Sequence, residues 1–412
     1  MRRVHLYAIL AAVSLLPQAL AASRLFSWLA ARPQALASLR FALPLLIALL
    51  NLPLVSELSR RRASPLLRAL AAPLYPFFTA WWLGSLFLAL LSLAALPVLW
   101  LSRLLGADAR GLPAWLQLLP FLFSTYGAFL GSSLLRHDRV RVPIALMPRE
   151  LRGLKILQLS DLHSGRHVSA RRLTRIARRA ARLKPDLVVV TGDIVHDQTG
   201  YAAQAARALG SIKPRLGVYA CLGNHDFWAG ADAVEAALEK EGVIVLRNRG
   251  LLVAPSLWLC GVDDPWSGQL DLPAALAGKP RGAVTLLLSH QPNTWPLARK
   301  LGVELQLSGH THGGQIAATW LHRSLSLARL ITPFVAGLYR KGPHLLYVNR
   351  GAGSVVPMVR LGARPELTEI AFVDARALRG TGQAEQGAGR EELPGVQEAE
   401  DELAALGSRS PG

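Results

Sequence analysis

The side chains in this sequence that are best suited to chemistry are aspartates, histidines and one asparagine that follow short apolar runs. They occur in five signatures, each directly after such a run: Asp161-Leu162-His163, Gly192-Asp193, Gly223-Asn224-His225-Asp226, His290, and Gly309-His310-Thr311-His312-Gly313-Gly314. Short apolar runs bounded by turn residues are typical of buried β-strands. Strands that end in this way bring oxygen and nitrogen ligands together at the carboxyl edge of a sheet, where open α/β folds bind ligands. The set predicts a metal site, because coordination removes the cost of burying these polar groups.

The spacing within the signatures supports this interpretation. Asp161 and His163 are two residues apart, so on an extended segment both side chains point the same way and can share one ion. Glycines beside Asp193, Asn224 and His312 allow tight backbone turns. Each signature is weakly specific by itself, but their ordered combination, each after a strand, is strongly specific.

The elements that position these residues are predicted to form an α/β domain. The runs that read as strands are Lys155–Ser160, Leu187–Thr191, Val218–Leu222, Leu257–Gly261, Val284–Ser289, Glu304–Ser308, Leu345–Asn349 and Leu367–Val373. A helix is expected between the first two, because apolar residues recur there at spacings of 3, 4 and 3: Leu173, Ile176, Ala180 and Leu183. This alternation predicts a mixed sheet with covering helices. The same helix carries six arginines between Arg171 and Arg182, which form either a solvated face or a surface attracted to anionic lipid.

The first third of the chain is predicted to be a membrane region. Hydrophobic residues make up 51% of the 412 residues, which excludes a wholly disordered chain. Residues 1–142 contain four apolar segments, at about 4–22, 35–55, 71–101 and 112–135. Each is long enough for a transmembrane helix, which needs roughly 20 residues. A buried helical core is the alternative, and the second segment, with Pro44, Asn51 and Pro53, is the weakest of the four.

The loop arginines predict how these helices are oriented. Nine arginines lie before the first segment, between the second and third, and after the fourth, against five on the other side. The positive-inside rule therefore predicts a multi-pass protein of the inner (cytoplasmic) membrane, with its N-terminus and catalytic domain in the cytoplasm. If the second segment does not span the membrane, the catalytic domain is predicted on the opposite side of the membrane. Residues 1–21 also resemble a cleavable signal peptide.

The charge is divided unevenly along the chain. The net charge is +19, with +11 over residues 1–142, +12 over 143–372 and −4 over 373–412. A basic surface indicates an anionic partner, which could be nucleic acid, a membrane surface or a phosphorylated substrate. Residues 374–412 are rich in Gly, Ala, Gln and Glu and are predicted to be a disordered acidic tail. Cys221 and Cys260 match no disulfide framework or zinc cluster and are expected to be buried free thiols.

Some residues near the signatures match none of them. His167, His196, His322 and His344 are expected to be structural. Asp263 and Asp264 either face the site or hold a loop. Residues 319–343 mix aromatic and aliphatic side chains with arginine and lysine, and they form either a packed loop or a membrane-facing lid that admits a lipid chain.

Over about residues 150–372 the chain resembles the calcineurin-like metallophosphoesterase superfamily. The form GHTHGGQI at 309–316 and the later run Tyr347–Gly351 are similar to its bacterial membrane-associated branch. The resemblance implies a four-layer α/β/β/α sandwich with two metal ions at one end of the sheets. It also implies roles for the residues of the signatures: a first metal on Asp161, His163 and His312; a second on Asn224, His290 and His310; a bridge from Asp193; assistance to the leaving group from His225; and orientation of His225 by Asp226.

These observations predict an integral-membrane phosphoesterase that uses two divalent ions. Two close metal ions lower the pKa of water and stabilise the charge of phosphoryl transfer. Histidine, aspartate and asparagine ligands without a thiolate indicate Mn²⁺, Fe or Zn²⁺, and Mn²⁺ is the ion expected here. The expected substrate is a lipid-linked phosphate ester or pyrophosphate. UDP-2,3-diacylglucosamine, cleaved in lipid A synthesis, is one candidate, and phospholipids and polyprenyl pyrophosphate are its rivals.

Two other functions stay open. One is a nuclease of the same superfamily, although the basic charge is spread over the membrane loops and nucleic acid is not the expected partner. The other is a membrane signalling module whose phosphoesterase domain binds without turnover.

Overall fold

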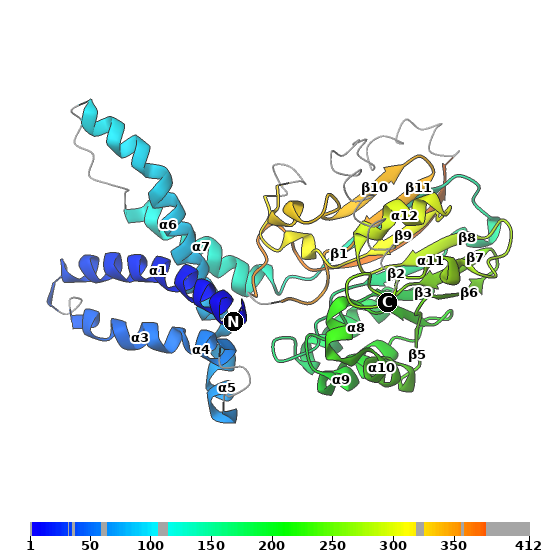
Figure 1. Cartoon of the computed structure of the whole chain (residues 1–412), viewed down its shortest axis with the longest axis horizontal. Helices are drawn as coiled ribbons and strands as arrows, with labels where there is room; N and C mark the ends of the chain where they lie inside the picture. Colours follow the sequence, from blue (N-terminus) through cyan, green and yellow to red (C-terminus); the bar gives the residue numbers. More distant parts are fainter. Residues whose placement is uncertain are drawn as a thin grey trace. The chain divides into compact units, whose positions relative to one another are not determined.

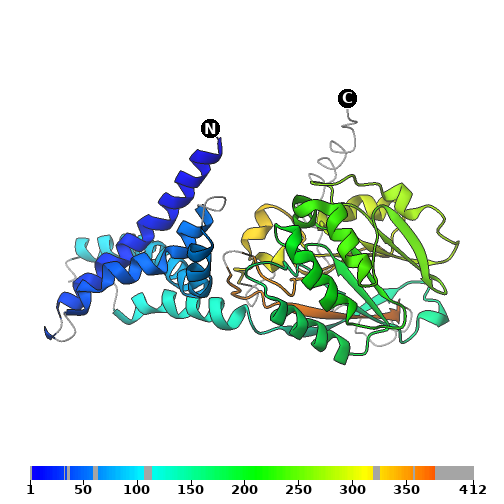
Figure 2. The same ribbon diagram turned by 90° about the horizontal axis from the view of Figure 1, so that it is seen from below.

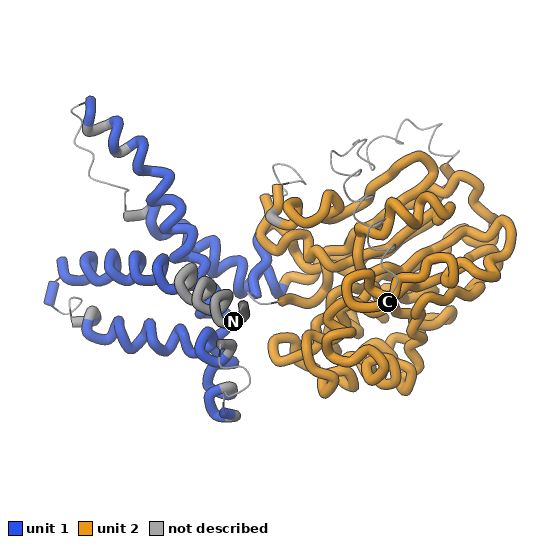
Figure 3. Tube along the Cα trace, viewed as in Figure 1, with its two compact units in different colours: residues 1–133, 356–361 blue, residues 134–355, 362–412 orange. Residues whose placement is uncertain are grey.

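The computed structural model describes residues 2–31, 33–34, 38–58, 64–105, 114–318, 325–355 and 358–375 of the chain. Contacts divide the chain into two compact units (Figure 3). Unit 1 comprises residues 1–133 and 356–361, and unit 2 comprises residues 134–355 and 362–412. The predicted acidic tail lies outside the described residues from position 376 onward.

Unit 2 is built on two mixed sheets of six strands each (Figure 1). The first sheet has the order β1 (Arg136–Ile144), β12 (Glu366–Asp374), β2 (Lys155–Leu159), β3 (Leu187–Thr191), β4 (Val218–Cys221), β5 (Val243–Val245). The second has the order β10 (Gly337–Lys341), β11 (His344–Val348), β9 (Leu305–Ser308), β8 (Val284–Leu288), β7 (Leu257–Gly261), β6 (Arg249–Ala254). Strands β2 to β5 are mutually parallel, and so are β7, β8, β9 and β11.

Of the four hydrophobic clusters among the described residues, three define the layers of this unit. The first packs α8 (Ala170–Arg182), α9 (Ala202–Gly210) and α10 (Asn224–Lys240) on the first sheet, as Figure 2 shows from below. The second joins the inner faces of the two sheets, with Val189 and Leu286 among its members. The third packs α11 (Leu272–Leu276) and α12 (Trp295–Lys300) against β7 and β8. Burial of each large aliphatic side chain stabilises the fold by about 1.5–3 kcal/mol.

The central strands are apolar along their whole length because both of their faces are covered. Every residue of β3, with the sequence LVVVT, is buried, as is every residue of β8. This is the pattern of parallel strands with covered faces. In register, Leu159 lies opposite Val190 and Thr191 lies opposite Cys221, so β2, β3 and β4 end at the same edge.

The eight strands expected from the sequence are present, each within one residue of its expected limits. The expected helix is α8, with Leu173, Ile176 and Ala180 buried. Four strands were not expected: β1, β5, β6 and β10. Strand β1 contains Arg136, Arg139 and Arg141, which the topology argument had counted in a loop, and it crosses the expected domain boundary at residue 142.

Unit 1 is helical. Its elements are α1 (Arg2–Ala30), η1 (Ser38–Phe41), α3 (Leu43–Leu50), α4 (Leu52–Leu58), α5 (Pro65–Ala71), η2 (Ala72–Leu74), α6 (Tyr75–Leu104), α7 (Ala114–Thr125) and the π-helical turn η3 (Tyr126–Gly131). Within the described residues, one helical stretch, Ala69–Val98, is long and apolar enough to cross a membrane. The stretches Leu43–Ser56 and Leu116–Gly131 are apolar but shorter.

Two close approaches organise unit 1. Gln18 on α1 accepts hydrogen bonds through its Oε1 from Asn51 Nδ2 at 2.9 Å and Trp81 Nε1 at 2.7 Å, which ties α1 to the α3–α4 junction and to α6. On η3, a Cβ atom at Gly131 would lie 2.0 Å from the carbonyl oxygen of Arg360. The backbone N–H of Arg360 also donates to the carbonyl of Gly127 at 3.1 Å. Residues 359–361 therefore pack on a face of η3 where only glycine, which has no side chain, leaves enough room for them.

Candidate metal centre

The seven side chains expected to bind metal follow the carboxyl ends of five strands, β2, β3 and β4 in the first sheet and β8 and β9 in the second. Because neighbouring parallel strands end at one edge, the loops that follow them converge. Among these seven, two groups of three have ligand atoms within 4.8 Å of one another: Asp161, His163 and His312, and Asp193, His290 and His310. All of these except His310 are buried.

In the first group, the three ligand atoms face one another. His163 Nε2 lies 3.0 Å from His312 Nε2 and 3.9 Å from Asp161 Oδ1, and His312 Nε2 lies 3.4 Å from Asp161 Oδ1. The backbone N–H of His310 donates to both oxygens of Asp161, at 3.1 and 3.2 Å. The loop after β9 therefore fixes the carboxylate supplied by the loop after β2.

The second group is built around Asp193. Its Oδ2 lies 3.2 Å from His290 Nε2, and His290 Nε2 lies 3.2 Å from His310 Nδ1. The same Oδ2 lies 3.5 Å from His163 Nε2 of the first group, so one carboxylate faces both groups. His290 Nδ1 donates to the carbonyl of Thr191 at 2.8 Å, which orients its other ring nitrogen toward Asp193.

This donor set fits divalent metal ions. Around an ion with bonds of about 2.1 Å, neighbouring ligand atoms lie roughly 3.0–3.4 Å apart. The separations of 3.0 Å between His163 and His312 and of 3.2 Å between His290 and His310 fall in this range. Asn224, at the start of α10, is 3% exposed, and its Oδ1 has no hydrogen-bond partner among the described residues. A buried amide oxygen without a partner is costly unless a cation takes that place.

The backbone of the site is strained. Nine described residues other than glycine have positive φ angles, and five of these are predicted ligands: Asp161, His163, Asp193, His310 and His312. Such conformations cost about 1–3 kcal/mol each and cluster at functional sites. The tight turns after β2, β3 and β9 thus aim these side chains inward at the expense of fold stability.

The electrostatics of the site are dominated by burial and by the pair Asp193–His290. Burial, the largest influence, raises the pKa of Asp193, but the charge and hydrogen bond of His290 together with the charges of His163 and His225 outweigh it and hold this pKa well below its ordinary value. Burial lowers the pKa of His290, whereas Asp193 raises it, with a net rise to about 10. Burial and the charge of His290 lower the pKa of His310 to about 3. A cation bound by His290 would take the place of its Nε2 proton, because metal-ligating imidazole is neutral.

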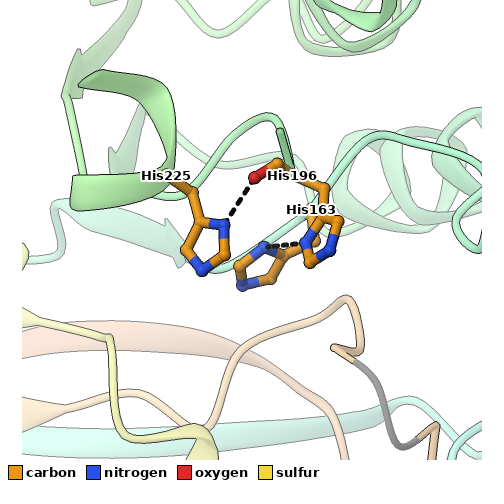
Figure 4. A group of neighbouring side chains, drawn as sticks. All are labelled: His163, His196 and His225. Atoms are coloured by element: carbon orange, nitrogen blue, oxygen red, sulfur yellow. Dashed lines mark hydrogen bonds between the residues drawn. The ribbon is translucent and has the colours of Figure 1, made fainter. Parts of the chain in front are cut away.

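His225 lies beside the first group, in contact with a histidine that the sequence analysis had considered structural (Figure 4). Its ring centroid is 4.8 Å from that of His163, and its Nδ1 hydrogen-bonds with the carbonyl of His196. The ring of His196 stacks on His225 at 5.0 Å, and its Nδ1 lies 3.4 Å from Nδ1 of His163. His196 is therefore part of the site. Its position three residues after Asp193, in the same turn, is the signal that could have identified it.

Asp226 has different partners from those that the resemblance implied. Its carboxylate accepts hydrogen bonds from the backbone N–H groups of Gly223, Ile194 and Val195, at 2.9, 3.2 and 2.8 Å. It thereby joins the first turn of α10 to the loop after β3, and the His196 carbonyl occupies the place beside His225 Nδ1. Burial and the neighbouring Asp193 raise the pKa of Asp226 to about 7.

The two aspartates left open by the sequence hold loops. Asp263 accepts a bidentate pair of hydrogen bonds from Arg247, and Asp264 accepts from the backbone of Trp266 and Ser267. Of the other histidines expected to be structural, His344 bonds through Nδ1 to the carbonyl of Val303 at 2.7 Å, and His322 lies outside the described residues.

Comparison with known proteins agrees with this fold and site. The family model described as calcineurin-like phosphoesterase matches residues 154–314. The chain is 35% identical to a Danio rerio "Transmembrane protein with metallophosphoesterase domain", over 57% of this chain and 57% of that protein. It is 31% identical to the Escherichia coli "Phosphodiesterase YaeI", over 57% of this chain and 88% of that protein. It is 30% identical to an uncharacterized metallophosphoesterase of Aquifex aeolicus, over 61% of this chain and 97% of that protein.

The fold and the two ligand groups define an α/β metal-dependent hydrolase domain. The chain belongs to the calcineurin-like metallophosphoesterase family, whose members act on phosphorylated substrates with a dinuclear divalent metal centre. The chain spans little more than half the length of the vertebrate relatives, 57% of the Danio rerio protein and 55% of the Bos taurus protein.

Proposed function

We propose that the protein is a membrane-anchored phosphoesterase that hydrolyses a phosphate ester or pyrophosphate with two divalent ions. The observation that carries this proposal is the pair of ligand groups that share the Asp193 carboxylate, with His225 beside them. The three hydrophobic clusters also support the four-layer α/β/β/α arrangement, because they lie on the outer face of each sheet and between the sheets.

The proposed ligands of the first ion are Asp161, His163 and His312, those of the second are Asn224, His290 and His310, and Asp193 bridges the two. When bound, the two ions supply a nucleophile at neutral pH and neutralise charge on the phosphoryl oxygens. The nitrogen and oxygen donors, without a thiolate, suit Mn²⁺, Fe or Zn²⁺, and Mn²⁺ is the ion we propose.

His225 supplies the proton to the leaving group in this mechanism. Its Nδ1 is held by the His196 carbonyl, so its Nε2 is the ring nitrogen that can exchange a proton with the substrate. Asp226 keeps the first turn of α10 in place through its three backbone hydrogen bonds, and so positions His225 indirectly.

The proposed location is the inner membrane, with several spans and the catalytic domain in the cytoplasm. The apolar stretch Ala69–Val98 and the word "transmembrane" in the names of two relatives support membrane attachment. The cytoplasmic side rests on the loop arginines alone, and without the three in β1 their excess is six against five. Helix α8 adds exposed arginines, among them Arg171, Arg175 and Arg178, that would favour an anionic membrane surface.

The proposed substrate is lipid-linked. Leu330 and Ile331 are 85% and 66% exposed in a loop that packs against the residues after His312, through the bridge between Ala317 and Ser326. Exposed aliphatic side chains beside a metal centre are suited to an acyl or prenyl chain. UDP-2,3-diacylglucosamine is one candidate, and phospholipids and polyprenyl pyrophosphate are the others.

The test is hydrolysis by the full chain, purified in detergent and loaded with Mn²⁺. Asp193→Asn should lower kcat/KM by at least about 10²-fold, because it weakens the hold on both ions. Asp271→Asn is the matched control, since Asp271 caps α11 and asparagine is an equally good cap. Metal content is measured in parallel. Full activity and full metal content in Asp193→Asn would overturn the site assignment.

A further inference from the structure

Two of the tryptophans in unit 2 are exposed. Of the four that the structure describes there, Trp258 and Trp295 are 6% and 4% exposed, whereas Trp228 and Trp266 are 64% and 53% exposed. Burial of an indole is strongly favourable, so an indole exposed to water lacks that stabilisation. Trp228 and Trp266 are therefore the tryptophans that could gain stabilisation by contact with a ligand.

Each exposed indole contacts a histidine of the proposed site. The ring of Trp228 lies 4.7 Å from that of His225, which itself lies 4.8 Å from the ring of His163 in the first ligand group. The ring of Trp266 lies 4.9 Å from that of His310 in the second ligand group, in a T-shaped arrangement. One indole thus lies next to each ligand group.

Both tryptophans are carried by segments that the fold fixes. Trp228 is in the first turn of α10, before the kink that Gly230 makes inside this helix, where φ is 113°. Trp266 is in a turn built on Asp264, whose Oδ1 accepts from the backbone N–H groups of Trp266 and Ser267 at 3.0 and 3.1 Å.

Arg247 joins these two segments. It donates to both oxygens of Asp263 at 3.0 and 3.1 Å, and to Asp232 on α10 at 2.8 Å. Its guanidinium also lies 5.3 Å from the ring of Phe227. A bidentate arginine–carboxylate pair fixes geometry as well as charge. The relative position of the two tryptophans is therefore built into the domain.

We propose that Trp228 and Trp266 are specificity-determining residues that hold the organic groups on the two sides of the phosphorus. The substrate class is then a phosphodiester, or a pyrophosphate with an organic group at each end, rather than a phosphomonoester. This inference rests on the proposed function. Because His225 serves the leaving group, Trp228 contacts the leaving group and Trp266 contacts the group that stays on phosphorus.

The test uses three nitrophenyl esters with the full chain: bis(p-nitrophenyl) phosphate, methyl p-nitrophenyl phosphate and p-nitrophenyl phosphate. All three have the same leaving group, but only the first has a ring on the retained side. Loss of an aromatic stacking contact lowers kcat/KM by roughly tenfold. Trp266→Ala should lower kcat/KM by that factor for the bis ester alone, and Trp228→Ala should lower it for all three esters, because they share the nitrophenyl leaving group.

Controls separate this inference from the proposed function. Leu252→Ala, at a 48% exposed position on β6, should leave all three rates unchanged. If wild type hydrolyses none of the esters, the proposed function fails. If wild type prefers the monoester, or if Trp228→Ala and Trp266→Ala match wild type on both diesters while Asp193→Asn is inactive, the assignment of the tryptophans is wrong and the phosphoesterase stands.

Discussion

His225 offers a test that depends on the chemistry of the leaving group. Its Nδ1 is held by the His196 carbonyl, so the proposed proton transfer uses Nε2. Protonation matters most for a strongly basic leaving group such as an alkoxide, and little for nitrophenolate. We expect His225→Ala to lower kcat by roughly 10²–10³-fold for an alkyl diester and by much less for a nitrophenyl ester.

The measurement is kcat for the two esters at saturating metal. His225→Asn, which keeps a polar group of similar size without a titratable nitrogen, is the companion variant. Equal losses on both esters would show that His225 positions the substrate or a ligand and does not donate the proton.

The two cysteines should be inert in the folded protein. Both are free and wholly buried. Burial raises the pKa of Cys260 to about 12, and burial together with the charge of Asp226 raises that of Cys221 well above its ordinary value. Since the thiolate is the reactive form, we expect no reaction with dithionitrobenzoate in the native protein and two thiols per chain in denaturant. A thiol that reacts quickly before unfolding would contradict this burial.

The sequence predicted which side chains meet at the site, but not all of their partners. Residue type and position after an apolar run can be read directly from the sequence. These two features identified Asp161, His163, Asp193, His290 and the two histidines after β9. The partners of Asp226 and the approach of His196 depend on left-handed turns, such as φ of 51° at Asp193, that residue type does not reveal. Whether these residues bind metal stays a prediction.

At the scale of elements, the sequence predicted the inner strands and missed the outer ones. The four strands that were not expected, β1, β5, β6 and β10, are the two edge strands of each sheet. An edge strand has fewer neighbours and tolerates charge, so it lacks the continuous apolar run that marks an inner strand. Strand β1, with the sequence RHDRVRVPI, is charged for this reason and resembles a loop in sequence.

The contact between β1 and the loop after β11 gives a prediction on stability. Arg350 pairs with the wholly buried Glu366 and lies 3.5 Å from Asp138 on β1. Removal of the arginine leaves a buried carboxylate without its counter-charge, so we expect Arg350→Ala to cost about 3 kcal/mol of unfolding free energy. Urea unfolding measures this cost, with the exposed Arg340→Ala as control.

A double variant distinguishes the ion pair from lost packing. Arg350→Met combined with Glu366→Gln removes both charges and keeps most of the volume, so it should recover much of the loss. If the double variant is as unstable as Arg350→Ala, the arginine acts through packing and the electrostatic explanation fails.

At the scale of the whole chain, composition predicted the apolar first third, and Asn51 with its neighbouring prolines marked the weak point of the second segment. The second apolar segment is divided into α3 and α4 around Asn51, and the fourth ends in a π-helical turn. The chain also enters unit 1 a second time, with residues 356–361. The packing of Arg360 on Gly131 joins residues more than two hundred positions apart, and no local pattern predicts such a contact.

Membrane attachment leads to the last prediction. If apolar helices such as Ala69–Val98 span the bilayer, hydrophobic burial holds the protein there and salt has little effect. If instead the arginines of α8 hold it at the surface, salt screens the attraction and releases it. We expect the full chain to stay with membranes through high-salt and alkaline washes and to leave only with detergent. Replacing Arg171, Arg175 and Arg178 by glutamine should not change this behaviour, and release by salt alone would show that the spans are not inserted.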